Sequence, residues 1–158
     1  MILLNSAPML STYASDKELY QWDTSAKNIS TVNLSEYFNG YNGSFTLYDL
    51  KNDTWDIYNM DLASLRTAPN STYKIYDALF GLETGIITPE ESTMAWNGAD
   101  YPFEAWNADQ TLDSAMKFSV NWYFQTLDER LGKSTLHSYL QKIGYGNENV
   151  TGDLASYW

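Results

Sequence analysis

The chain has 158 residues, of which 44% are hydrophobic and 16% aromatic, and it carries a formal net charge of −11. This length fits about one domain. So acidic a surface repels nucleic-acid phosphate and anionic lipid, and we expect no nucleic-acid partner. The sequence contains no cysteine, which excludes disulfides, thiolate chemistry and cysteine-based metal sites. We expect no metal site.

The N-terminal part of the sequence predicts a hairpin after an irregular start. Residues 1–40 are polar and lack a clear period, so we expect an irregular or linker segment there and one folded domain in 41–158. Apolar and polar residues then alternate in 44–50 and again in 54–58, on either side of a turn-forming Lys51-Asn52-Asp53. This pattern predicts a β-hairpin, which needs further strands or a helix to cover it.

The rest of the sequence predicts helices. One begins after Pro69-Asn70, where Asn70 can cap the first turn, and Gly85 can end it in a left-handed conformation. Its apolar residues cover nearly every face, so we expect it to be buried. An ordered loop is expected next, and three further helices are expected in 111–117, 121–131 and 134–144. The predicted fold class is α+β, a mainly helical body with an N-terminal β-hairpin.

The segment Ser71-Thr72-Tyr73-Lys74 has the residue types that acyl transfer to serine requires. Serine is a poor nucleophile until a base takes its proton, and lysine can be that base only if its pKa falls well below about 10.4. Ser71 and Lys74 are three residues apart and share a helix face, and the free N–H groups of the first turn favour an oxyanion. Ile75, Ala78 and Phe80 are apolar neighbours that can desolvate Lys74. We therefore predict acylation of Ser71 with Lys74 as the base.

Other motifs distinguish this segment from chance, because Ser-x-x-Lys alone recurs at Ser114-Ala115-Met116-Lys117. Ser119-Val120-Asn121 precedes an aromatic stretch, Tyr145-Gly146-Asn147 follows a predicted helix, and the chain ends in Tyr157-Trp158. In order and approximate spacing, these motifs resemble the set found in class D β-lactamases and in BlaR/MecR sensor domains, over about 43–158. We expect the second Ser-x-x-Lys copy to be ordinary helix surface.

The resemblance implies a serine penicillin-recognising fold of the class D type and a role for each site residue. Ser71 is the residue acylated by the β-lactam carbonyl, and Lys74 is a base in N-carboxylated form, which needs carbon dioxide but no other cofactor. Ser119 passes a proton to the departing β-lactam nitrogen, and Trp158 donates its indole N–H to the carbamate. Tyr145, Gly146 and Asn147 belong to the substrate-binding set. The alternatives are that Ser119 is only a helix cap and Trp158 only a core aromatic.

Asn121 is the residue that separates the two kinds of relative. Class D enzymes resemble one another in having valine there, whereas the sensor domains resemble this chain in having asparagine. An amide can hydrogen-bond Lys74 and favour its uncarboxylated form after acylation, so that the adduct persists. The favoured function is a β-lactam sensor at the extracellular face of the bacterial membrane, in a signal transducer whose membrane segments are absent here. A class D β-lactamase, a penicillin-binding peptidase and a structural helical domain remain alternatives, so enzymatic turnover stays open.

One motif of the family is missing from the sequence. The family closes its site with a Lys-Thr-Gly or Lys-Ser-Gly strand, and the nearest string here, Lys133-Ser134-Thr135, lacks the glycine. We therefore expect a chain truncated before this strand that binds β-lactams poorly by itself. The exposed hairpin edge predicts association with a second copy or with a complementing C-terminal fragment.

Overall fold

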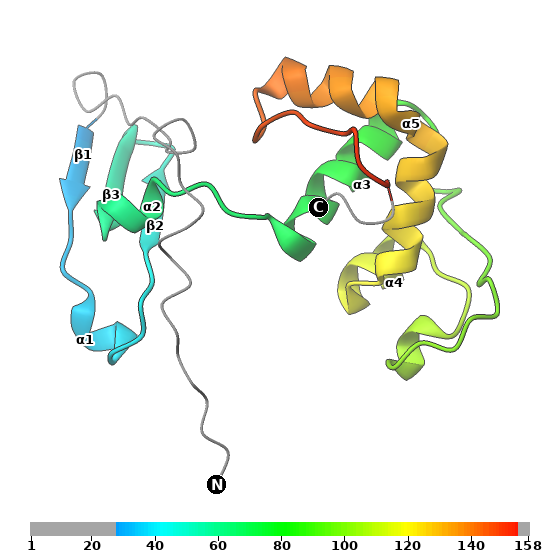
Figure 1. Ribbon diagram of the computed structural model, residues 1–158, viewed down its shortest axis with the longest axis horizontal. Helices are drawn as coiled ribbons and strands as arrows, with labels where there is room; N and C mark the ends of the chain where they lie inside the picture. The colour runs from blue at the N-terminus through cyan, green and yellow to red at the C-terminus, as the bar shows by residue number, and fades with distance from the viewer. Residues whose placement is uncertain (1–27, 155–158) are drawn as a thin grey trace, which may run out of the picture. The chain divides into compact units, whose positions relative to one another are not determined.

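The computed structural model describes residues 28–154, which form two compact units divided between Thr67 and Ala68 (Figure 1). The described part of the first unit holds a small sheet and two short helices, whereas the second unit is helical. The predicted α+β class, with a mainly helical body and an N-terminal β-hairpin, is confirmed.

The first unit is built around the predicted hairpin. Strands β2 (Phe45–Asp49) and β3 (Thr54–Tyr58) pair in antiparallel register, with Phe45 opposite Tyr58. The Asp49 carboxylate accepts hydrogen bonds from the backbone N–H groups of Lys51 and Asn52, at 2.9 and 3.2 Å, which fixes the turn. Short helices α1 (Ser35–Phe38) and α2 (Met60–Ala63) flank the strands in sequence.

A third strand lies where we expected irregular structure. Strand β1 (Asn28–Thr31) pairs in parallel with β3, giving the sheet order β1-β3-β2. The central strand β3 therefore has partners on both sides, and its Ile57 is fully buried, whereas Leu47 on the outer strand β2 is 49% exposed. The predicted uncovered edge is thus wrong for β3. The boundary at residue 40 stays a prediction.

The second unit contains all the residues of the Ser-x-x-Lys segment. Its elements in chain order are η1 (Asn70–Tyr73), α3 (Lys74–Glu83), η2 (Glu104–Trp106), α4 (Leu112–Phe118) and α5 (Asn121–Ile143). Thr111 caps α4, as predicted, by accepting a hydrogen bond from the Ser114 N–H at 3.3 Å. Gly85, Gly132 and Gly144 have positive φ angles of 72°, 74° and 61°, so they end or interrupt helices as the sequence indicates.

The start and the outer face of α3 differ from expectation. Asn70 does not cap the helix. Instead it adopts φ 49° and its side-chain amide donates back to the Ala68 carbonyl at 3.3 Å. The expectation that α3 is buried on every side is also wrong, because Ile75 and Leu79 are 59% and 52% exposed. Among the described residues, α3 packs through its other face, against α5.

The core of the second unit lies between α3 and α5. Its buried members include Tyr73, Phe80, Ile87, Met94, Trp122, Tyr123, Phe124, Leu127 and Leu136. Gly81 permits the close approach of the helices, since a Cβ atom there would lie 2.9 Å from Leu127 Cδ2. No helix within 28–154 has the length and apolar character needed to cross a bilayer.

This packing predicts unequal effects of two leucine substitutions. Leu127→Ala is expected to lower the free energy of unfolding by about 2–5 kcal/mol, because Leu127 is fully buried and its loss leaves a cavity. Leu79→Ala removes the same atoms from the exposed face of α3, and it is expected to change the free energy of unfolding by about 0.5 kcal/mol or less. Urea unfolding of both variants measures the difference. Equal losses would contradict the assignment of α3's two faces.

Candidate functional site

The Lys74 side chain is the meeting point of the predicted site residues. Its residue is only 2% exposed. Its Nζ atom lies 3.0 Å from Ser71 Oγ, 2.9 Å from Ser119 Oγ, and 3.1 Å from the Ser119 carbonyl oxygen. Asn121 Oδ1 completes the set at 2.5 Å. Ser71, Ser119 and Asn121, which the sequence places up to 50 residues apart, therefore surround one amine.

The local backbone explains why these groups converge. Ser71 lies in η1 and Lys74 begins α3, so the spacing of three residues places both on one face. Ser119 follows α4 with φ 53° and ψ 47°, a left-handed conformation that costs roughly 1–3 kcal/mol for a residue other than glycine. This conformation directs both its hydroxyl and its carbonyl group to Lys74. Ser119 thus ends a helix and also belongs to the site.

The number of acceptors around Lys74 bears on its protonation state. An ammonium group has three N–H donors, but four oxygen atoms lie within 3.1 Å of Nζ. The Ser119 carbonyl and Asn121 Oδ1 can only accept. A neutral amine satisfies these two with its two N–H bonds and keeps a lone pair for a hydroxyl group. Lys74 can therefore satisfy these neighbours either as an ammonium group, which donates to three of the four oxygens, or as a neutral amine.

Burial lowers the pKa of Lys74 from its ordinary value, and the nearby Asp77 carboxyl partly opposes this effect. Of the three apolar neighbours expected to desolvate Lys74, Ala78 and Phe80 are buried but Ile75 is not. Ile75 is 59% exposed, whereas the ring of Phe124, from α5, lies 5.9 Å from Nζ. The desolvation of Lys74 thus depends partly on a helix more than 40 residues away in sequence.

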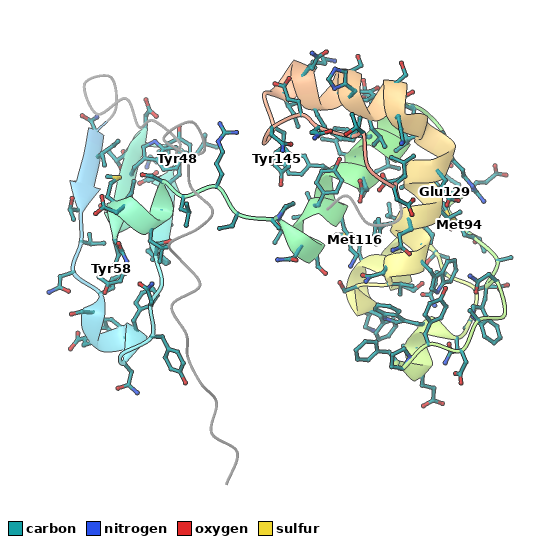
Figure 2. All side chains as sticks on the ribbon, in the orientation of Figure 1. Tyr48, Tyr58, Met94, Met116, Glu129 and Tyr145 are labelled. Atoms are coloured by element: carbon teal, nitrogen blue, oxygen red, sulfur yellow. The ribbon has the colours of Figure 1, made fainter. Side chains whose placement is uncertain are left out.

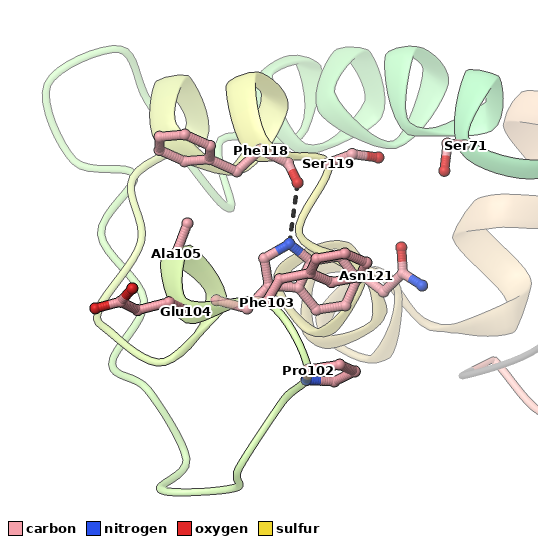
Figure 3. A pocket seen from close by; sticks show the side chains of 9 residues that line it. Ser71, Pro102, Phe103, Glu104, Ala105, Phe118, Ser119 and Asn121 are labelled. Carbon is pink, nitrogen blue, oxygen red and sulfur yellow. Dashed lines mark hydrogen bonds between the residues drawn. The ribbon is translucent and has the colours of Figure 1, made fainter.

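A cleft of about 660 Å³ opens next to these residues (Figure 3). Ser71, Ser119 and Asn121 line one part of it, and residues 102–106 with Phe118 line the rest. The Trp106 indole N–H donates to the Phe118 carbonyl at 3.0 Å, which holds this aromatic wall in place. The cleft can therefore receive an apolar group while a carbonyl carbon reaches Ser71.

The predicted binding residues Tyr145, Gly146 and Asn147 are not among the residues that line this cleft. Tyr145, labelled in Figure 2, packs against the rings of Tyr73 and Tyr76, with centroid distances of 5.8 and 4.4 Å. Gly146 has φ 60°, and Asn147 Oδ1 accepts a hydrogen bond from the Asn149 N–H at 3.0 Å. Their roles in substrate binding stay predictions.

The prediction for Trp158 falls outside the described residues. Within those residues, no group of three histidine, cysteine, aspartate or glutamate side chains could hold a metal ion.

The second Ser-x-x-Lys copy has a different environment, as expected. Ser114 Oγ accepts a hydrogen bond from the Thr111 N–H at 3.0 Å and donates one to Gln110 Oε1 at 2.8 Å. Lys117 is exposed, and its ammonium group lies 5.3 Å above the Phe118 ring. Ser114 therefore stabilises the start of α4, and its lysine is solvated.

The sequence reasoning did not identify the fully buried Asp77 and Asp128, or the cleft wall formed by Phe103 and Trp106. The sequence position of Asp77 could have indicated it, because it follows Lys74 by three residues and so shares the helix face of Lys74. The position of the wall depends on loop structure that has no periodic pattern.

A buried lysine that hydrogen-bonds a serine at a helix start, beside a ligand-sized cleft, is the arrangement expected of the penicillin-recognising class. The chain belongs to the family of the penicillin binding protein transpeptidase domain, whose model matches residues 23–158. The predicted resemblance to BlaR/MecR sensor domains and class D β-lactamases is confirmed by individual relatives and solved structures.

Individual relatives agree with this family. The chain is 40% identical over 156 residues to the methicillin resistance mecR1 protein of Staphylococcus aureus (strain Mu50), covering 99% of this chain and 26% of the relative. It matches the solved C-terminal domain of the Bacillus licheniformis BlaR penicillin-receptor with a TM-score of 0.79 and 42% identity, over 84% of this chain and 54% of that one. A class D β-lactamase from Bacillus subtilis matches with a TM-score of 0.77 and 36% identity, over 80% of this chain and 54% of that one. The chain thus spans about a quarter of the mecR1 protein and about half of each solved domain.

Proposed function

We propose that this chain is part of a β-lactam sensor, in which a β-lactam acylates Ser71 and the acyl adduct persists. The observation that carries the proposal is the hydrogen bond between Asn121 Oδ1 and Lys74 Nζ. The similarity to the mecR1 protein and to the BlaR penicillin-receptor supports it. In the whole protein, the proposal places this domain on the extracellular face of a membrane signal transducer.

Acylation follows from the contacts of Lys74. In its carbamate form, the Lys74 base takes the proton of Ser71, whose Oγ lies 3.0 Å from Nζ, and Ser71 Oγ attacks the β-lactam carbonyl carbon. The carbonyl C–N bond of the ring then breaks. Lys74 returns the proton through the Ser119 hydroxyl, 2.9 Å away, to the departing nitrogen. Ser119 thus acts as a proton carrier between the base and the leaving group.

Persistence of the adduct follows from Asn121. The proposal includes carboxylation of Lys74 by carbon dioxide before the drug binds, with loss of the carboxyl group after acylation. A carbamate replaces one N–H donor with an anion. It then faces the Ser119 carbonyl and Asn121 Oδ1, which are both acceptors. Because these oxygens favour the free amine, water lacks the carbamate base that it needs to release the acyl group.

The experiment is a time course of intact mass after a pulse of penicillin. The protein is this chain, together with a fusion that supplies a Lys-Thr-Gly strand. We expect an adduct of one drug molecule that remains after free drug is removed, with little hydrolysed penicillin in solution. Loss of the adduct with rapid penicillin hydrolysis would favour the second candidate, a class D β-lactamase, which the similarity to the Bacillus subtilis enzyme supports.

Asn121→Val is expected to shorten the lifetime of the adduct. Valine removes the amide oxygen that favours the free amine, so the carbamate survives and deacylation should accelerate by roughly 10²-fold, the lower end of the contribution of a general base. Thr126→Val is the matched control. It changes a residue of the same helix whose hydroxyl donates to the Trp122 carbonyl, one turn earlier, and not to a site residue. Carbon-13 NMR with labelled carbon dioxide measures the carbamate directly. An unchanged carbamate signal and lifetime in Asn121→Val would contradict this role.

A further inference from the structure

Two carboxyl groups are buried next to the base and have no part in the mechanism above. Asp77, on α3, and Asp128, on α5, are both fully buried. Asp77 follows Lys74 by three residues, and Asp128 follows Asn121 by seven, so each shares a helix face with a site residue. The helices that bring Lys74 and Asn121 together therefore also bring the two carboxyl groups together.

The two carboxyl groups cannot both be ionised at low cost. Neither Asp77 oxygen finds a hydrogen-bond donor when both groups are carboxylates. A proton on either group supplies that donor, and Asp77 and Asp128 then share a side-chain hydrogen bond. Burial first, and then the Asp128 charge and this bond, raise the pKa of Asp77 far above its ordinary value. At neutral pH the pair therefore holds one proton and one negative charge.

Among the described residues, Asp77 interacts with titratable groups from its own helix, from α5 and from the segment after α5. Asp128 faces it from α5, Lys74 from its own helix, and Tyr145 from the segment after α5. Burial first, then Tyr76 and Asp77, raise the pKa of the Tyr145 phenol, so this group stays neutral. Lys74 is the cation among these groups. Its charge favours an ionised Asp77, and the negative charge of Asp77 in turn favours a protonated Lys74.

We propose that Asp77 and Asp128 are positioning residues that share one proton and thereby set the charge state of Lys74. With two protons distributed over the three groups, the cluster is either an ammonium group beside a singly ionised pair, or a neutral amine beside two carboxylic acids. In the second state none of the three groups carries a charge. In the second state the pair holds the proton that Lys74 has lost, and in the first state its negative charge favours the ammonium form of Lys74.

This inference rests on the proposed function in one respect, which is the role of Lys74 as the base. The coupling itself is electrostatic and requires no direct bond between Lys74 and Asp77. It can therefore be measured without any β-lactam.

The primary test is a carbon-13 NMR titration of the 158-residue chain, observing the aspartate carboxyl carbons and Lys74 Cε. We expect one carboxyl of the pair to stay protonated above neutral pH, and its signal to change together with that of Lys74. In the double variant Asp77→Asn/Asp128→Asn, which keeps the shape but has no charge, Lys74 should titrate at lower pH than in the wild type. Each single variant keeps one carboxylate beside an amide donor and should leave the Lys74 titration near the wild-type position.

A stability measurement supplies a second readout. Because the native pair binds more protons than the unfolded chain, the wild-type unfolding temperature should fall as pH rises above about 4. The double variant should lose this slope, and Glu129→Gln, which removes an exposed carboxyl next in sequence, should keep it (Figure 2 labels Glu129). A merely structural role would change the unfolding temperature equally at every pH.

The outcomes separate this inference from the proposed function. If both carboxyl groups of the wild type are ionised at neutral pH, or if Lys74 titrates identically in the double variant, the inference is overturned. The wild-type titration decides the first point even if a variant fails to fold. If the coupling is present but Ser71 is never acylated, the proposed function fails and the coupling stands.

Discussion

Ser71→Ala is expected to abolish covalent labelling by penicillin, whereas Ser114→Ala should label as the wild type does. Both serines begin a Ser-x-x-Lys segment, so the pair is a direct test of whether environment or motif decides reactivity. Ser71 Oγ lies 3.0 Å from a buried lysine and lines the cleft. Ser114 Oγ is engaged in capping α4, and its lysine, Lys117, is exposed. Serine needs an adjacent base to become nucleophilic, and only Ser71 has one.

Intact-mass analysis of the two variants after exposure to excess penicillin measures this result, and peptide mapping of the wild type identifies the acylated residue. Ser114→Ala removes a capping hydroxyl, so circular dichroism should first show that α4 and its surroundings are retained. An adduct mapped to Ser114, or undiminished labelling of Ser71→Ala, would overturn the assignment of the nucleophile.

Features encoded by neighbouring residues could be predicted from the sequence. The hairpin follows from alternation on both sides of a turn. The helix ends at Gly85 and Gly144 and the interruption of α5 at Gly132 follow from the conformational freedom of glycine. The pairing of Ser71 with Lys74 is likewise local, since it depends only on a spacing of three residues at a helix start. Each of these depends on short-range geometry, which the sequence specifies directly.

Features that depend on distant partners could not be predicted in the same way. Strand β1 is a short polar segment whose strand character comes from its parallel pairing with β3, and nothing in its own sequence indicates that partner. The contacts of Ser119 and Asn121 with Lys74 join residues 45 and 47 positions apart, so family resemblance rather than spacing indicated them.

Buried charge was the least predictable feature of the site. Aspartate is rarely buried without a partner, so Asp77 and Asp128 read as surface residues when each helix is considered alone. Only the packing of α3 on α5 brings them together and makes their burial tolerable through a shared proton.

Lys74→Ala is expected to slow acylation of Ser71 by about 10²–10⁴-fold, the usual contribution of a general base. Removal of the amine leaves Ser71 with no proton acceptor and leaves Ser119 with no partner from which to carry a proton. Lys117→Ala, the equivalent change in the second motif copy, removes an exposed lysine and should leave acylation unchanged. Rapid-quench labelling with penicillin, followed by mass analysis, measures both rates, and the helical circular dichroism of the two variants should remain close to that of the wild type.

Lys74→Arg distinguishes loss of a base from loss of a positive charge. Arginine keeps the cation that balances the Asp77–Asp128 pair, but it cannot be deprotonated in a protein and so cannot accept the Ser71 proton. If Lys74 acts as the base, Lys74→Arg should be as slow as Lys74→Ala. In the wild type, burial lowers the Lys74 pKa, so the acylation rate should rise with pH below the range in which an exposed lysine titrates. This rise in rate should be absent in both variants. Acylation of Lys74→Arg at the wild-type rate would show that Lys74 contributes charge alone, and that Ser71 loses its proton to another group.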